Sequence, residues 1–171
     1  MKAMQNSMKA ARSDRRTRGR AQRDPFIDPY QARQKPKEPT GCPQCGAVYH
    51  KGRWHWGATP DGAHAARCPA CQRIADAMPA GIVTLHGDFA KRHKDEMTGL
   101  MRNEEAAEKS EHPLNRIMSI DESEEGLTVN TTDIHLPRRL GEALERAFHG
   151  SLDMHFDENS YMARVDWHPP A

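Results

Sequence analysis

Four cysteines stand in two close pairs, Cys42-Pro-Gln-Cys45 and Cys68-Pro-Ala-Cys71, with 22 residues between the pairs. A gap of two residues lets one turn present two sulfur atoms to the same metal ion, and zinc takes four such ligands at the corners of a tetrahedron. The spacing therefore predicts one structural zinc ion, because four thiolates leave no position for a catalytic water. Two disulfides or a redox motif are the alternatives, but a redox motif usually occurs once rather than twice at matched spacing.

The segment between the two pairs predicts a β-hairpin over residues 48–56, with its turn at Lys51-Gly52, which is the plan of a zinc ribbon. Cations and aromatic rings alternate along this hairpin, and we expect Lys51, Arg53 and Trp54 to contact a ligand. Such a mixture can stack exposed bases and bind phosphates. The alternative is that this small module packs Trp54 and Trp56 against the rest of the chain.

The N-terminal part of the chain is strongly basic. Residues 1–37 carry eleven Lys and Arg against three Asp and Glu, whereas the remainder carries 14 against 21. A basic tail on an acidic body predicts a polyanionic partner, most often nucleic acid, although a solubilising extension is the alternative. The predicted phosphate contacts in this tail are Arg12, Arg15, Arg16, Arg18, Arg20 and Arg23. Residues 1–23 hold almost no large apolar side chain, so we expect them to be disordered alone.

A second basic cluster lies at the start of a predicted helix that runs from Asp88 to just before Pro113. Lys91, Arg92 and Lys94 occupy its first turns, and acidic residues gather near its end. Both placements oppose the helix macrodipole, so they indicate a surface kept for an anion rather than for stability. On this hypothesis, Lys91→Glu with Lys94→Glu stabilises the isolated protein and weakens RNA binding. The alternative is a solvated helix face.

The elements that must position these residues follow from composition and periodicity. We divide the chain into a disordered tail (1–23), a proline-rich linker (24–41), a zinc ribbon (42–78) and an α+β domain (79–171). In the last of these, apolar alternation and helical stripes predict strands over 82–86, 117–120, 127–131, 152–156 and 161–167, and helices over 88–112 and 136–147. The order βαββαβ with one further strand predicts a ferredoxin-like fold, an antiparallel sheet with both helices on one face.

Several function classes are disfavoured by what the sequence lacks. It contains no GxxxxGK[ST] loop, no GxGxxG after a strand, no GxSxG and no HExxH, so we expect neither an enzyme nor a small-molecule substrate. No run of about 18 apolar residues is present, which argues against a membrane span. The N-terminus has no apolar stretch typical of a secretory signal, and paired thiols favour a reducing compartment, so we expect a cytoplasmic protein.

Motifs along the whole chain resemble an uncharacterised bacterial zinc-ribbon family. They are Asp24-Pro25, Asp28-Pro29-Tyr30, Cys42-Pro-Gln-Cys45-Gly46, Cys68-Pro-Ala-Cys71, Pro79-Ala-Gly-Ile-Val83, Arg102-Asn103-Glu104-Glu105 and Thr131-Thr-Asp-Ile-His135. More distantly, the family is similar to the zinc-binding region of the adaptor that exports the large ribosomal subunit from the eukaryotic nucleus. The resemblance implies contact with the ribosome or ribosomal RNA, with a role in assembly or dormancy.

Together these features predict a non-enzymatic, zinc-binding and RNA-binding protein that associates with the ribosome and contacts ribosomal proteins there. Two alternatives from other classes stay open. One is a protein–protein adaptor, and the other is a transcriptional regulator; both would use the zinc ribbon and the α+β domain as docking surfaces.

Overall fold

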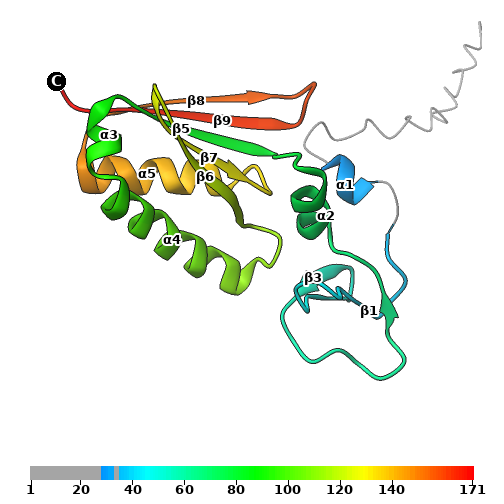
Figure 1. The fold of residues 1–171 in the computed structure, drawn as a ribbon. Helices are drawn as coiled ribbons and strands as arrows, with labels where there is room; N and C mark the ends of the chain where they lie inside the picture. Colours follow the sequence, from blue (N-terminus) through cyan, green and yellow to red (C-terminus); the bar gives the residue numbers. More distant parts are fainter. Residues whose placement is uncertain (1–27, 33–34) are drawn as a thin grey trace, which may run out of the picture.

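The protein is described by a computed structural model that covers residues 28–32 and 35–171. Within these residues the chain forms five helices and two separate sheets, a mixed α+β architecture. The smaller sheet belongs to the cysteine module and the larger one to the C-terminal part of the chain (Figure 1). None of the described helices has both the length and the hydropathy needed to cross a lipid bilayer.

The cysteine module is built on a sheet of four very short strands in the order β3-β2-β1-β4. These strands are β1 (Thr40–Gly41), β2 (Val48–His50), β3 (Arg53–His55) and β4 (His64–Ala65). The predicted hairpin is confirmed, because β2 and β3 pair antiparallel on either side of Lys51 and Gly52. Both turn residues have positive φ, 51° and 77°, which matches the right-handed twist of the paired strands.

Two short helices pack together beside this sheet, α1 (Pro29–Ala32) and α2 (Pro69–Asp76). Arg73 of α2 donates to the carboxylate of Asp28 at 2.7 Å, and both side chains are more than nine-tenths buried. The guanidinium of Arg73 also lies 4.2 Å from the centre of the Tyr30 ring. Part of the predicted linker is therefore docked on the cysteine module, and a buried ion pair holds it there.

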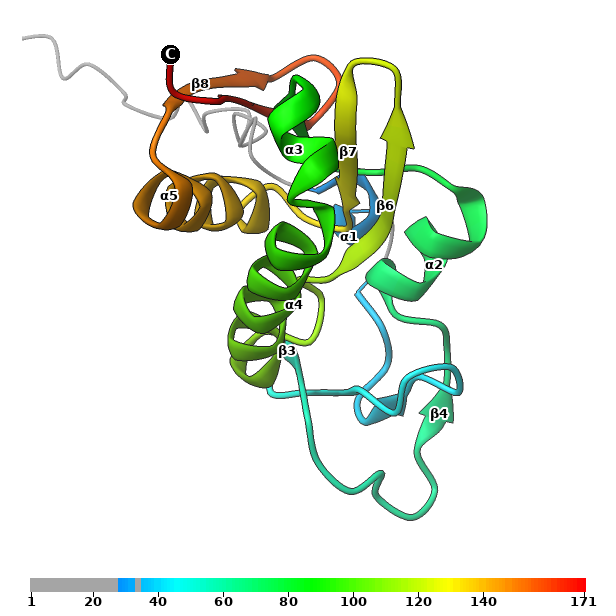
Figure 2. The same cartoon turned by 60° about the vertical axis from the view of Figure 1, so that its left-hand side comes forward.

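The C-terminal part forms a five-stranded sheet in the order β6-β7-β5-β9-β8. Its elements are β5 (Gly81–His86), α3 (Asp88–Arg92), α4 (Lys94–Glu111), β6 (Ile117–Ser123), β7 (Gly126–Thr131), α5 (Leu136–Phe148), β8 (Ser151–Asp157) and β9 (Met162–His168). Helices α4 and α5 lie on the same face of the sheet (Figures 1 and 2). Strand and helix side chains meet there in one apolar core, whose largest fully buried member is Trp167. All five predicted strands and both helical regions are present.

The arrangement of the strands differs from the predicted antiparallel sheet. Strand β9, rather than β8, lies beside β5, and these two strands run parallel. Burial explains why β9 rather than β8 lies beside β5, because β9 buries Ala163, Val165 and Trp167 whereas no residue of β8 is buried. The apolar strand of the C-terminal hairpin takes the central position and the polar strand takes the edge.

Asp133 is a buried carboxylate just before helix α5. Its Oδ2 accepts hydrogen bonds from the backbone N–H groups of His135 and Leu136 at 2.8 and 3.1 Å, which satisfies two of the open N–H groups at the start of the helix. Its Oδ1 is buried and has no hydrogen-bond partner among the described residues. Burial raises the pKa of Asp133 to about 6, outweighing the two N–H groups that lower it.

This raised pKa predicts a pH-dependent stability. A carboxyl group that is protonated more readily in the folded state than in the unfolded state makes folding less favourable as pH rises from about 4 to about 6. We expect Asp133→Asn, which keeps an acceptor oxygen without the charge, to raise the free energy of unfolding by up to about 3 kcal/mol near neutral pH. The gain should shrink on acidification, which denaturant unfolding of both proteins at about pH 5 and about pH 7.5 will measure. A gain independent of pH would contradict the assignment.

Candidate metal centre and the groove beside it

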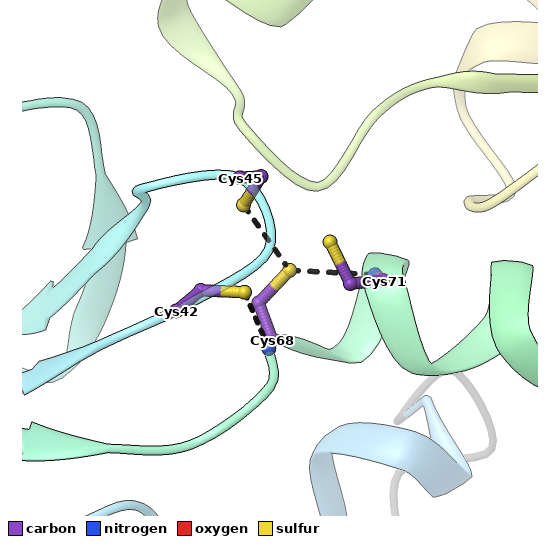
Figure 3. A group of neighbouring side chains, drawn as sticks. All are labelled: Cys42, Cys45, Cys68 and Cys71. Carbon is purple, nitrogen blue, oxygen red and sulfur yellow. Dashed lines mark hydrogen bonds between the residues drawn. The ribbon is translucent and has the colours of Figure 1, made fainter.

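The four cysteines converge on one point from two segments of the chain (Figure 3). Cys42 and Cys45 lie in the turn between β1 and β2, and Cys68 and Cys71 lie at the start of α2. All four sulfur atoms are within 4.8 Å of one another, and none of the cysteines forms a disulfide. The Sγ atoms of Cys45 and Cys68 are 3.7 Å apart, close to the edge of about 3.8 Å in a tetrahedron with metal–sulfur bonds of about 2.3 Å. The cluster is suited to a metal ion.

Local backbone geometry turns the first pair of sulfurs inward. Gly46 adopts φ of +79°, a conformation that a side chain disfavours, and its N–H donates to the carbonyl of Cys42 at 2.9 Å. The next amide, that of Ala47, donates to Sγ of Cys45 at 3.5 Å. Gly46 therefore allows a tight turn in which the amide of Ala47 points toward the sulfur atom of Cys45.

The second pair uses the start of α2 in the same way. Cys68 is the N-cap residue of this helix, and its Sγ accepts from the N–H of Cys71 at 3.4 Å. The N–H of Cys68 donates to Sγ of Cys42 at 3.2 Å, which ties the two pairs together. Amide donors of this kind stabilise thiolates, the form in which cysteine binds metal.

The thiols differ in acidity because burial and amide donors compete. Burial raises the pKa of Cys68 and of Cys71, and neighbouring donors offset this only in part. At Cys42 burial also acts to raise the pKa, but N–H groups of Cys68, Cys45 and Gln44 outweigh it and bring the pKa down to about 7. Buried thiols that resist ionisation need a cation to hold them as thiolates, and the donor set here fits a soft or borderline metal such as zinc.

Arg116 is the one residue of this centre that sequence reasoning missed. It directly precedes β6, and only 6% of it is exposed. Its guanidinium donates to Sγ of Cys45 at 3.1 Å, of Cys71 at 3.2 Å and of Cys68 at 3.5 Å. No local pattern marks it, because its partners lie 45 to 71 residues earlier in the chain.

A groove of about 1210 Å³ opens between the cysteine module and the loop that follows α4. We call it the basic groove, because its lining includes Lys35, Lys37, Arg53 and Arg67, all exposed, and no Asp or Glu among the described residues. Rings of Tyr30, Tyr49 and Trp54 and the exposed imidazoles of His64 and His112 also line it. The 113–115 segment forms its boundary on the side of the second sheet.

The predicted nucleic-acid contacts form three groups, which are the hairpin residues, the tail arginines and the basic cluster of Lys91, Arg92 and Lys94. Arg53 and Trp54 line the basic groove, whereas Lys51 sits at the hairpin turn and is not part of the lining. Trp56 follows the alternative prediction, since its Nε1 donates to the carbonyl of Lys109 in α4 at 2.6 Å. The six tail arginines lie outside the described residues, and their role stays a prediction.

The third group, Lys91, Arg92 and Lys94, does not line the basic groove, and the reversed-charge interpretation is wrong at Lys91 and Arg92, whereas Lys94 does begin the long helix α4. The predicted helix is divided at His93 into α3 and α4. Lys91 and Arg92 therefore occupy the last turn of α3, where cations are favourable. Lys91 donates to the carbonyl of Glu124 at 2.8 Å and Lys94 to the carboxylate of Glu122 at 3.0 Å, so both bind the β6–β7 hairpin.

The acidic residues near the end of α4 also have structural partners. Arg139 of α5 donates to Glu104 at 2.7 Å and to Glu108 at 2.6 Å. Glu105 accepts from the backbone N–H of Ile117 at 2.7 Å. These carboxylates fasten α4 to α5 and to β6, so their position does not indicate a surface kept for a ligand.

The contacts of Lys91 and Lys94 reverse the change in stability that we expect for the double variant at these positions. Lys91→Glu with Lys94→Glu should lower the free energy of unfolding by about 1 kcal/mol, because Lys91 pairs with Asp88 and Lys94 with Glu122, and a glutamate at either position would repel its partner. A thermal melt measures this effect. Lys91→Arg with Lys94→Arg, which preserves both charges, should melt like the parent protein. A more stable Glu variant would restore the original interpretation.

Comparisons with known proteins give no match: no protein-family model fits the chain, and no curated protein or solved structure is similar to it. Assignment of function to the metal centre and the basic groove therefore depends on their geometry and chemistry.

Proposed function

We propose that this protein is a non-enzymatic RNA-binding protein, that zinc fills its cysteine centre as a structural ion, and that RNA binds in the basic groove. One observation carries the proposal: the lining of the groove combines four Lys and Arg with exposed ring surface and no described carboxylate. Four thiolates complete the zinc shell, so the ion shapes the module and takes no part in a reaction.

The charge of the groove suits a phosphate backbone. Lys35 and Lys37 come from the segment before β1, Arg53 from β3 and Arg67 from the segment before α2. Within residues 28–32 and 35–171, none of these four side chains takes part in an ion pair. Cations gathered from separate segments without acidic partners bind a polyanion by displacing its counterions.

The aromatic residues of the groove suit single-stranded RNA. Trp54 is half-buried, and its ring lies 5.4 Å from that of Tyr49 at an angle of 59°. Tyr49 is 7% exposed, and Trp54 packs on the cysteine cluster, so the part of the indole that stays exposed is held rigidly in the groove, where we expect it to contact an unpaired base. Stacking of this kind contributes about 1–3 kcal/mol per base and tolerates any sequence.

Titration of the full chain with a labelled single-stranded RNA of mixed sequence tests the proposal. At about −0.7 per phosphate, the four groove cations are expected to contribute about −3 to the slope of log K against log salt, and any phosphate contact made by the tail arginines adds to it. Duplex DNA should compete weakly, because an intact duplex offers no free base to Trp54. Equal competition by duplex DNA would favour the transcriptional regulator, and absence of salt-dependent binding would favour the protein–protein adaptor.

The ribosomal part of the proposal comes from the family resemblance and needs its own test. Sedimentation of a cell lysate through a sucrose gradient should place the protein in the fractions of the ribosomal subunits, and high salt should release it. RNA binding without cosedimentation would keep the activity and remove the ribosome as its target.

A further inference from the structure

Arg116 links the metal centre to the second sheet. Its backbone is bonded to the second sheet at the end of β7. The N–H of Arg116 donates to Oγ1 of Thr132 at 2.9 Å, and its carbonyl accepts from the N–H of Thr132 at 2.9 Å. Its guanidinium reaches the other way, to the sulfur atoms of Cys45, Cys68 and Cys71. One side chain thus joins two modules that otherwise have separate cores.

Electrostatics explain why a guanidinium lies at this place. Four thiolates around a divalent cation would carry a net charge of about −2, and a buried charge needs compensation. The guanidinium supplies one positive charge through forked N–H groups, which can contact several sulfur atoms at once.

The same side chain positions one boundary of the basic groove. Nε of Arg116 donates to the carbonyl of Pro113 at 2.7 Å, and residues 113–115 line the groove. Another contact between the modules, from Trp56 to the carbonyl of Lys109, lies at the end of α4 just before this loop. Arg116 is therefore bonded both to the sulfur atoms and to the segment that lines the groove together with Arg53 and Arg67.

We infer that Arg116 is a positioning residue: because it bonds the sulfur atoms of the cysteine centre and the carbonyl of Pro113 at once, it fixes the second sheet and the 113–115 boundary of the basic groove against the cysteine module. The expected effect of Arg116 on RNA binding rests on the proposed function. The coupling of the cysteine centre to the second sheet by Arg116 does not depend on it.

Hydrogen exchange at the tryptophan indoles, measured in the full, metal-loaded chain, tests whether Arg116 couples the two modules. The Trp56 indole bonds across the modules, whereas that of Trp167 donates to the carbonyl of His149 within the second one at 2.8 Å. We expect Arg116→Gln to accelerate exchange of the Trp56 indole about tenfold and to leave Trp167 unchanged. In Arg116→Lys, which keeps the charge but not the forked N–H groups, the Trp56 indole should exchange at a rate between those of the parent and of Arg116→Gln. The control Arg146→Gln, at an exposed position, should exchange like the parent.

Two further readouts complete the test. Arg116→Gln should still bind one metal ion per chain, yet release it to a chelator faster, by about tenfold or more. It should also bind the mixed-sequence single-stranded RNA about tenfold more weakly than the parent does. If no protein in the set binds RNA, the proposed function fails while indole exchange still decides the role of Arg116.

Unchanged Trp56 exchange and unchanged metal release in Arg116→Gln would overturn the inference. Should that variant not fold, Arg116→Lys decides in the same two measurements. Faster exchange at Trp167 as well as Trp56 would also count against it, since that result means general loosening of the second sheet.

Discussion

Cys68→Ser is expected to release the metal ion and to unfold residues 40–72, while the five-stranded sheet stays folded. Cys68 is fully buried, and its sulfur contacts Cys45 and the N–H of Cys71. The buried members of the apolar cluster around it are cysteines and two alanines, with Trp54, Trp56 and Leu114 packed on the outside, so the module has too small a core to replace the metal. Binding of a structural zinc ion contributes about 10–16 kcal/mol in small zinc modules, and most of that is folding free energy.

Native mass spectrometry and amide hydrogen exchange measure the two halves of this prediction. Metal content should fall from one ion per chain, and protection should vanish over residues 40–72 but persist in β5, β7 and β9. His64→Ala is the matched control, since His64 belongs to the same module, is exposed and is not among the clustered ligands. Full metal content in Cys68→Ser would contradict the four-sulfur assignment, as would loss of metal in His64→Ala.

The metal ligands could be predicted because their chemistry is local in sequence. Two residues between paired cysteines, and Gly46 after the first pair, already describe the turn that presents the sulfur atoms. Arg116 could not be predicted on the same grounds. It meets the cysteines only because β6 and α2 are neighbours in space, and a lone arginine before a strand has no periodicity that would reveal this contact.

The secondary structure was likewise more predictable than its assembly. Alternation along residues 152–156 and 161–167 identified both C-terminal strands, but it is present in each and does not say which one pairs with β5. Trp167 settles that choice, since its large side chain is buried only in the central position. The break at His93 also escaped the pattern, because the helical stripe continues through it.

That break has consequences for electrostatic arguments drawn from sequence. A charge is favourable or unfavourable on a helix according to its distance from the nearest end, so an unrecognised end changes the sign for Lys91 and Arg92. Contacts with Glu122 and Glu124 then explain the lysines without any ligand. By contrast, Arg53 and Arg67 are in no ion pair within the described part of the chain, which makes them the sharper probes of function.

Arg53→Glu with Arg67→Glu is expected to weaken binding of single-stranded RNA by roughly 100-fold at low salt. Both side chains are exposed in the basic groove, and reversing them places two carboxylates beside the phosphates that the groove would hold. The slope of log K against log salt should become shallower by about 0.7 for each contact removed, or by about 1.4 in all. Fluorescence anisotropy at several salt concentrations measures both quantities.

Lys91→Glu with Lys94→Glu is a matched control for that experiment, because it lowers the net charge by the same amount at a site that does not line the groove. It should shift RNA affinity only slightly and leave the salt slope near that of the parent. If the two double variants weakened binding equally, the overall charge of the protein would account for its affinity for RNA, and the basic groove would lose its role. A large loss confined to the arginine pair assigns RNA binding to the groove, because position is then the property in which the two variants differ.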